Sequence, residues 1–121
     1  MTKRILVVED QENSLKILRD LLSHASFEII EAKNGEEAVR AAAAERPDLI
    51  LMDIQLPLLD GYEATRRIKA DPSLCAIPII AVTSYALSGD EPKIRAAGCD
   101  DFVPKPYSPR QLLANIRQRL Q

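Results

Sequence analysis

The sequence is poor in the residues on which several common chemistries depend. His24 is the only histidine among 121 residues, which nearly excludes a histidine-based zinc site or catalytic triad. We expect His24 itself to lie on a helix surface. Cys75 and Cys99 are the only cysteines, and they form no Cys-x-x-Cys pair. We interpret both as reduced, small apolar residues rather than as a disulfide or a metal-binding pair.

Long apolar runs and blocks of basic residues are also missing. No segment approaches the roughly 18 apolar residues of a membrane-spanning helix, and the beginning, MTKRILVVED, reaches acidic residues too early for a signal peptide. We therefore expect a cytoplasmic protein with no membrane insertion. The net charge of −2, without a cluster of lysines and arginines, argues against direct binding to nucleic acid.

What remains is the composition of one soluble globular domain. The chain is 46% hydrophobic and 28% charged, which is enough for one core, and its length leaves no room for a second domain. We expect residues 1–121 to form a stand-alone domain, because no output domain follows the last predicted helix.

Short apolar runs alternate with longer segments of helical spacing. The runs show no polar alternation, which predicts strands buried on both faces, as in a parallel sheet. They lie at residues 5–8, 27–30, 49–52, 77–82 and 101–103. The predicted helices are marked by Leu15, Leu18 and Leu22, by NGEEAVRAAAAER, by residues 62–70 and 90–97, and by Leu112, Leu113, Ile116 and Leu120.

Capping signals agree with this alternation. Asn34 is a suitable helix cap with Glu37 at the third position, and SPRQ at residues 108–111 gives a second capping box with proline at the first helical position. Gly98 is expected to end the fourth helix. The residues therefore predict five strand–helix repeats, an α/β sandwich with helices on both faces of the sheet.

Polar side chains follow the predicted core strands. In an open parallel sheet these positions lie together at the carboxyl edge, where such sheets bind ligands. They are Glu9 and Asp10 after the first strand, Asp53 after the third, Thr83 after the fourth and Lys105 after the fifth. Each of these residues, taken alone, is more simply interpreted as a turn, cap or solvent-exposed residue. The prediction of a functional site therefore depends on their joint placement at one edge.

Gathering three acids at one edge is costly. Two carboxylates about 5 Å apart repel by roughly 3 kcal/mol at an effective dielectric near 20. A bound divalent cation removes that repulsion, and a ligand set made of oxygens alone selects Mg²⁺, or Mn²⁺, over zinc. Lys105 would then pair with an anionic group to which the Thr83 hydroxyl donates. The set suits transfer of a phosphoryl group onto a carboxylate, with Asp53 best placed as nucleophile.

Four segments, ILVVED, PDLILMDIQLPLLDGYEATRRI, IPIIAVTS and AGCDDFVPKP, resemble the receiver domain of two-component response regulators. The resemblance covers essentially the whole chain and implies a flavodoxin-like sheet in the order 2-1-3-4-5. It implies that Asp53 accepts a phosphoryl group from a histidine kinase or a phosphotransfer protein. It further implies a cis Lys105–Pro106 peptide, Thr83 as the switch hydroxyl and Lys105 as the phosphate contact.

The same resemblance assigns the metal ligands. Glu9, Asp10 and Asp53 would hold Mg²⁺, with the main-chain carbonyl of Gln55 as a further ligand. Three positions depart from the usual family pattern. Glu9 replaces an aspartate, and its longer reach suggests metal contact through water. Phe102 as the switch aromatic has no hydroxyl, and Pro104 stiffens the entry to the Lys105 loop.

Phosphorylation adds nearly two negative charges. We expect Thr83 to move toward the phosphate and Phe102 to fill the vacated space, as a population shift between two packings. The face formed by residues 84–107 and the last helix would change its protein–protein contacts. Catalytic activity would be limited to self-phosphorylation from small donors and slow self-dephosphorylation, with Gln55 and Tyr85 flanking the site.

Three other functions share parts of this pattern. A flavodoxin-like FMN binder places hydroxyl residues and glycine after the first strand, where this chain has EDQENS. A phosphatase of the haloacid dehalogenase type needs a second acid two residues after the nucleophile, where Gln55 stands. A degenerate receiver that works as an adaptor independent of phosphorylation stays open, because an intact pocket does not prove its use.

Overall fold

The computed structural model describes residues 2–56, 59–83 and 91–120 and contains alternating strands and helices. The strands are β1 Arg4–Val8, β2 Glu28–Ala32, β3 Leu49–Asp53, β4 Ile79–Thr83 and β5 Asp101–Pro104. The helices are α1 Glu12–His24, α2 Gly35–Glu45, α3 Gly61–Ala70, α4 Glu91–Ala97 and α5 Pro109–Arg119. The predicted alternation of strand and helix is confirmed along the chain.

The strands form one parallel sheet in the order β2-β1-β3-β4-β5, as the family resemblance implies. Every residue of β3 and β4 is buried, which explains their unbroken apolar runs. The register pairs Val8 with Met52 and Asp53 with Val82, so that β1, β3 and β4 end close together. The polar residues that follow these strands are thereby delivered to one edge of the sheet.

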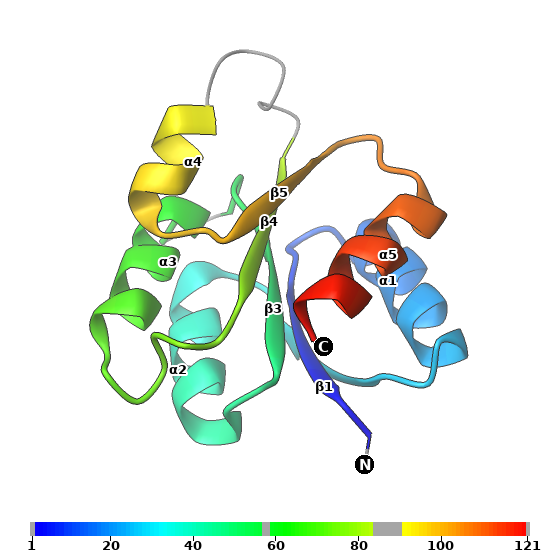
Figure 1. The fold of residues 1–121 in the computed structure, drawn as a ribbon, viewed down its shortest axis with the longest axis horizontal. Coiled ribbons are helices and arrows are strands. Elements are labelled where there is room, and N and C mark those ends of the chain that lie inside the picture. Colours follow the sequence, from blue (N-terminus) through cyan, green and yellow to red (C-terminus); the bar gives the residue numbers. More distant parts are fainter. Residues whose placement is uncertain (1, 57–58, 84–90, 121) are drawn as a thin grey trace.

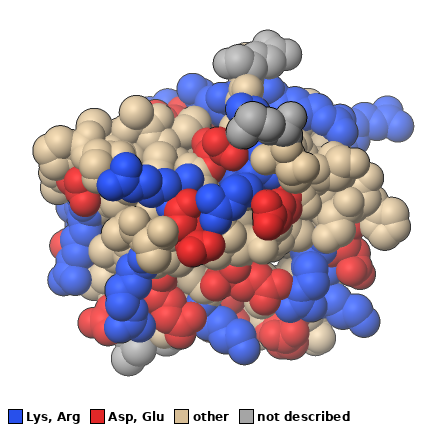
Figure 2. All heavy atoms as spheres, turned by 90° about the horizontal axis from the view of Figure 1, so that it is seen from below, with Lys and Arg blue, Asp and Glu red and all other residues tan. Residues whose placement is uncertain are grey.

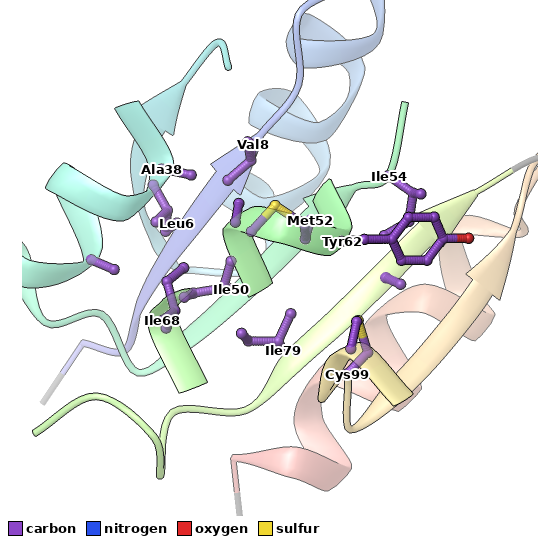
Figure 3. Packing of buried hydrophobic residues seen from close by; sticks show 14 of the residues in the cluster. Leu6, Val8, Ala38, Ile50, Met52, Ile54, Tyr62, Ile68, Ile79 and Cys99 are labelled. Carbon is purple, nitrogen blue, oxygen red and sulfur yellow. The ribbon is translucent and has the colours of Figure 1, made fainter. Parts of the chain in front are cut away.

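Helices cover both faces of the sheet (Figure 1). On one face α2, α3 and α4 pack against side chains such as Leu6, Ile50 and Met52. Figure 3 shows Ile68 of α3 lying close to Ile50 in this cluster. On the other face α1 and α5 pack against the strand residues that point the opposite way. The members of that second cluster include Ile5, Val7, Leu15, Leu22, Leu51, Ile80, Leu112 and Ile116.

The predicted caps are present. The Asn34 side chain accepts a hydrogen bond from the backbone N–H of Glu37 at 2.9 Å, and Ser108 caps α5 with proline at its first turn. Gly98 follows α4 with φ +107°, a conformation that glycine adopts without strain. A further cap, Asp60 at the start of α3, was not predicted, and its side chain accepts from the backbone N–H of Glu63 at 2.9 Å.

Two strands begin later than their apolar runs. β2 begins at Glu28 because Ser26 has φ +71° and the Phe27 N–H still bonds to the Leu22 carbonyl of α1. β4 begins at Ile79 because Pro78 has no N–H to donate, although its carbonyl accepts from the N–H of Ile50 at 2.9 Å.

The sequence analysis assigns no catalytic or metal-binding role to His24, Cys75 or Cys99. His24 is exposed at the end of α1, and both cysteines are free. Cys99 is buried whereas Cys75 is exposed. Positive and negative side chains are interspersed on the face shown in Figure 2. Arg4 and Glu45 form one of the ion pairs of the described chain, at 2.9 Å. No helix among the described residues is long and apolar enough to cross a bilayer.

Gly61 at the start of α3 packs directly against the end of β3. A Cβ atom at this position would lie 2.5 Å from the carbonyl oxygen of Asp53 and 2.7 Å from the Cα of Ile54. Both atoms belong to the backbone, so no side-chain rotation relieves the overlap. The Gly61 N–H also donates to the Ile54 carbonyl at 3.1 Å. This glycine therefore fixes the distance between α3 and the residue Asp53.

We predict that Gly61→Ala lowers the free energy of unfolding by about 1–3 kcal/mol, because the added methyl group overpacks against backbone. Urea denaturation of the two proteins measures the difference. Ser23→Ala, at an exposed position on α1, is the control and should change stability by less than about 0.5 kcal/mol. Equal stability of Gly61→Ala and the unmodified protein would contradict this account of the α3–β3 contact.

Candidate functional site

Three carboxylates meet at the carboxyl edge of the sheet. One oxygen each from Glu9, Asp10 and Asp53 lies within 4.8 Å of the others. Glu9 and Asp53 are almost fully buried, with 2% and 4% of their surface exposed, and Asp10 is half-buried. The structure therefore brings together the three acids that the sequence analysis placed at this edge.

Backbone hydrogen bonds of the sheet hold these acids in place. The Glu9 N–H donates to the Ala32 carbonyl at the end of β2, at 3.0 Å. Asp53 is the last residue of β3, and the next N–H, that of Ile54, reaches the Val82 carbonyl of β4 at 3.3 Å. The Asp53 carboxylate also accepts the N–H of Gln55 at its Oδ1 atom, at 3.0 Å. Both buried acids are thus anchored by neighbouring strands.

Lys105 supplies the cation of the site. Its Nζ atom lies 3.2 Å from Oδ2 of Asp53 and 3.9 Å from Oε2 of Glu9. Its backbone N–H donates to the Thr83 carbonyl at 2.9 Å, which joins the end of β5 to the end of β4. The Lys105–Pro106 peptide is cis, as the resemblance implies. Asp53 therefore uses both carboxylate oxygens, one toward Gln55 and one toward Lys105.

The surroundings of Glu9 disfavour its charged form. Burial, and after it the nearby Asp53 carboxylate, raise the pKa of Glu9 from 4.5 to about 8, against the opposing effect of the Lys105 ammonium. One of its oxygens, Oε1, is buried without a hydrogen-bond partner among the described residues. A buried carboxylate oxygen without a partner is costly, and a cation in contact with it would remove that cost.

The donor set fits a hard divalent cation. The three clustered side chains offer only carboxylate oxygens, which Mg²⁺ prefers over nitrogen or sulfur ligands. The unpartnered Oε1 belongs to Glu9, which is one of the three clustered acids. These observations support the cation site that the sequence analysis predicts.

The remaining predicted site residues lie near the same edge. Thr83 ends β4 and is fully buried, beside Pro104 in the register of β4 and β5. Phe102 is half-buried in β5, with the Arg95 guanidinium of α4 over its ring at 5.7 Å. Gln55 is exposed in the loop after β3. Tyr85 and the rest of residues 84–90 lie outside the described residues.

Sequence reasoning missed residues that border the site from other elements. Ser14 and Ile17 of α1 and Tyr107 of the loop before α5 line a cavity that also reaches Glu9 and Asp53. The leucine stripe of α1 indicated only which side of the helix is buried, and Ile17 lies off that stripe. Ile17 is 58% exposed, and an exposed residue does not contribute to the periodic pattern of buried apolar residues. The one signal that could have identified Ser14 and Ile17 is that their predicted helix lies beside the carboxyl edge of the sheet.

The chain belongs to the family of response regulator receiver domains, whose pattern matches residues 5–117. It is similar to the polar-differentiation response regulator DivK of Brucella anthropi, with 45% identity over 99% of this chain and 98% of that protein. DivK of Brucella ovis is 44% identical over the same shares. The segments MDIQLP and GDE…IRAAGCDDF by themselves indicate a likeness to DivK, which these matches confirm.

Solved structures agree with this assignment. The receiver domain of a sensor histidine kinase from Pseudomonas aeruginosa is 36% identical, with a TM-score of 0.93 over 99% of this chain and 98% of that chain. That structure holds a magnesium ion in its active-site cleft. The chemotaxis response regulator CheY4 of Vibrio cholerae, 24% identical with a TM-score of 0.93 over 99% of this chain and all of that chain, shares the fold.

The raised pKa of Glu9 predicts how stability depends on pH without metal. Between its ordinary pKa of 4.5 and the raised value of about 8, the folded protein binds more protons than the unfolded chain. Unfolding free energy therefore falls as pH rises from about 5 to 8, by at most about 1.4 kcal/mol per pH unit from this group. Urea denaturation in EDTA at several pH values measures this slope.

Glu9→Gln should flatten that slope, because the amide stays neutral at every pH. The control is Glu36→Gln at an exposed position of α2, which should keep the slope of the unmodified protein. If Glu9→Gln and the unmodified protein lose stability equally between pH 5 and 8, the burial of Glu9 does not control this dependence.

Proposed function

We propose that the chain is a phosphoacceptor response regulator of a two-component or phosphorelay system, and that Asp53 carries the phosphoryl group in a Mg²⁺-dependent reaction. The observation that carries the proposal is the buried Asp53 carboxylate. It lies within 4.8 Å of Glu9 and Asp10 and 3.2 Å from the Lys105 ammonium. Membership of the receiver family supports the same function.

The residues proposed to hold Mg²⁺ are Glu9, Asp10, Asp53 and the main-chain carbonyl of Gln55, and Mn²⁺ would fit the same oxygens. When bound, the cation supplies positive charge to the oxygens of the transferring phosphoryl group. The magnesium ion in the cleft of the Pseudomonas aeruginosa receiver domain supports this assignment. The unpartnered Oε1 of Glu9 supports it independently.

The proposed transfer begins with attack of an Asp53 carboxylate oxygen on the phosphorus of the donor. A P–O bond to Asp53 forms while the bond from phosphorus to the leaving group breaks, and the leaving group departs with the bonding electrons. Lys105 is in place to contact the phosphoryl oxygens, because its Nζ already lies 3.2 Å from Asp53 Oδ2. Thr83, at the end of β4, would donate its hydroxyl to the same group.

The proposed donors are a histidine kinase or a histidine phosphotransfer protein, and the proposed location is the cytoplasm. Receiver domains take phosphoryl groups from such partners. The DivK relatives, matched over 98% of their length, support a single receiver domain as the functional unit. Direct contact with nucleic acid is not part of the proposal. The result of phosphorylation would be a change of protein–protein contacts.

The proposed output face includes α4, β5 and α5. The described residues of this face make the following contacts. The seven-residue α4 buries Ile94 and Ala97, and the Arg95 guanidinium lies over the Phe102 ring. Arg119 of α5 donates to the Asp100 carbonyl at 2.7 Å, just before β5. A phosphoryl group that draws Thr83 toward Asp53 would let Phe102 turn inward and leave Arg95 without its ring contact.

We predict that acetyl phosphate adds one phosphoryl group to the protein only when Mg²⁺ is present and Asp53 is intact. Intact mass spectrometry with and without Mg²⁺ measures the adduct. Asp53→Ala should abolish it, whereas Asp20→Asn, which changes an exposed acid on α1, should leave it in place. Lys105→Gln should slow adduct formation by about 100-fold, since one charged donor to the transferring group is lost.

A folded protein that gains no adduct with Mg²⁺ present would contradict phosphorylation from small donors. The same protein should then be tested with a phosphorylated histidine kinase. Failure with both donors would favour an adaptor that works without phosphorylation. An adduct that survives in Asp53→Ala would show that another residue is the acceptor.

The switch proposal makes a separate prediction for Thr83→Ala. This variant should still gain the adduct, because Asp53 remains, but should lose the conformational response. Hydrogen exchange of residues 91–107 measures that response. Phosphorylation should alter exchange in the unmodified protein and change it little in Thr83→Ala. Equal responses in both proteins would show that the Thr83 hydroxyl does not transmit the signal.

A further inference from the structure

A cavity of about 550 Å³ opens beside Asp53 on the face of the sheet that α1 and α5 cover. One wall is formed by Ile17 and Leu18 of α1, and the opposite wall by Tyr107 and Pro109 at the beginning of α5. The volume falls within the range of small-molecule sites and is lined mainly by apolar groups. Such a hollow next to a reactive carboxylate is larger than a phosphoryl group requires.

The cavity is continuous with the reactive groups. Its lining includes Asp53 itself together with Glu9 and Lys105, so the cavity adjoins the charged site. The lining also includes Ile17, a large apolar residue that is 58% exposed, which is unusual among the described residues. A second hollow of about 350 Å³, lined by Gln55, Tyr62 and four other residues, does not include Asp53.

The direction of phosphoryl transfer decides what this space can hold. In an in-line displacement the leaving group lies on the far side of phosphorus from the attacking oxygen. With a phosphoryl group over Asp53 and beside Lys105, an in-line leaving group would lie further out, and the cavity lined by α1 and the Tyr107 segment is the adjoining space that would receive it. Those walls are apolar, and burying apolar surface of a leaving group there is favourable.

We propose that this cavity binds the apolar acyl group of small acyl phosphates, so that the site prefers benzoyl phosphate to donors with a small acyl group such as acetyl phosphate. The inference rests on the proposed phosphorylation of Asp53. In the reaction the Asp53 oxygen bonds to phosphorus and the P–O bond to the benzoyl group breaks. Benzoate leaves with the electron pair, and no oxidant, reductant or additional reactant is required.

The test compares initial rates of adduct formation with benzoyl phosphate and acetyl phosphate at equal concentrations and with Mg²⁺, by intact mass. The informative quantity is the ratio of the two rates in each protein, because the intrinsic reactivities of the donors cancel between proteins. Ile17→Ser should lower the ratio of benzoyl to acetyl rates about 5-fold, through loss of an apolar wall. Lys16→Ser, next on α1 but not lining the cavity, should leave it unchanged.

A second measurement does not depend on any variant. Benzoate should compete with acetyl phosphate and raise its apparent KM, whereas acetate at the same concentration should have a smaller effect. Circular dichroism of Ile17→Ser checks that the exposed substitution keeps the fold.

Three results would overturn the inference. The first is an unchanged ratio in Ile17→Ser while acetyl phosphate still modifies Asp53, which leaves the proposed function standing. The second is benzoate that competes no better than acetate. The third is slower transfer from a phosphorylated histidine kinase in Ile17→Ser with an unchanged ratio, which would assign this face to a protein partner. Absence of any adduct with either donor would overturn the proposed function as well.

Discussion

The placement of two buried carboxylates beside a single ammonium group is the constraint on which the site depends. At separations below 5 Å, each pair among Glu9, Asp10 and Asp53 repels by roughly 3 kcal/mol at an effective dielectric near 20. Lys105, 3.2 Å from Asp53 and 3.9 Å from Glu9, opposes this repulsion. Burial, and after it the nearby Asp53 carboxylate, nevertheless raise the pKa of Glu9, and a neutral Glu9 relieves both penalties. A divalent cation would be the alternative relief, and under the proposed function it would leave the Asp53 carboxylate able to attack phosphorus.

The rest of the fold holds these charges where they would not gather by themselves. The fully buried strands β3 and β4 fix the backbone of Asp53 and Thr83, and the N–H of Lys105 bonds to the Thr83 carbonyl across the sheet edge. Gly61 brings α3 against the carbonyl of Asp53 with no space for a methyl group. Since interiors are closely packed, a shift of Thr83 or Phe102 would repack neighbours rather than deform them smoothly. This would be the physical basis for the proposed switch between two packings.

The sequence predicts the strands and the sheet edge that carry this site better than the individual contacts within it. Unbroken apolar runs identify the strands, and the acids after them identify the carboxyl edge, because strand periodicity and parallel topology leave few alternatives. The cap at Asn34 follows from side-chain chemistry alone. The late start of β2 depends on the positive φ of Ser26, and the role of Gly61 depends on a contact between backbones, neither of which leaves a pattern in the sequence. The cavity behind Ile17 arises from how α1 and the Tyr107 segment are spaced, which only the packed structure defines.

The most direct measurement is the chemical mapping of the phosphorylated residue. After phosphorylation with Mg²⁺ present, borohydride reduction converts an aspartyl phosphate to homoserine, and tandem mass spectrometry of the peptides locates it. The account predicts homoserine at position 53 alone, with Asp10 and the other acids of the described chain unchanged. Homoserine at Asp10 or another acid, with position 53 still aspartate, would contradict the claim that the buried Asp53 beside Lys105 is the phosphoacceptor.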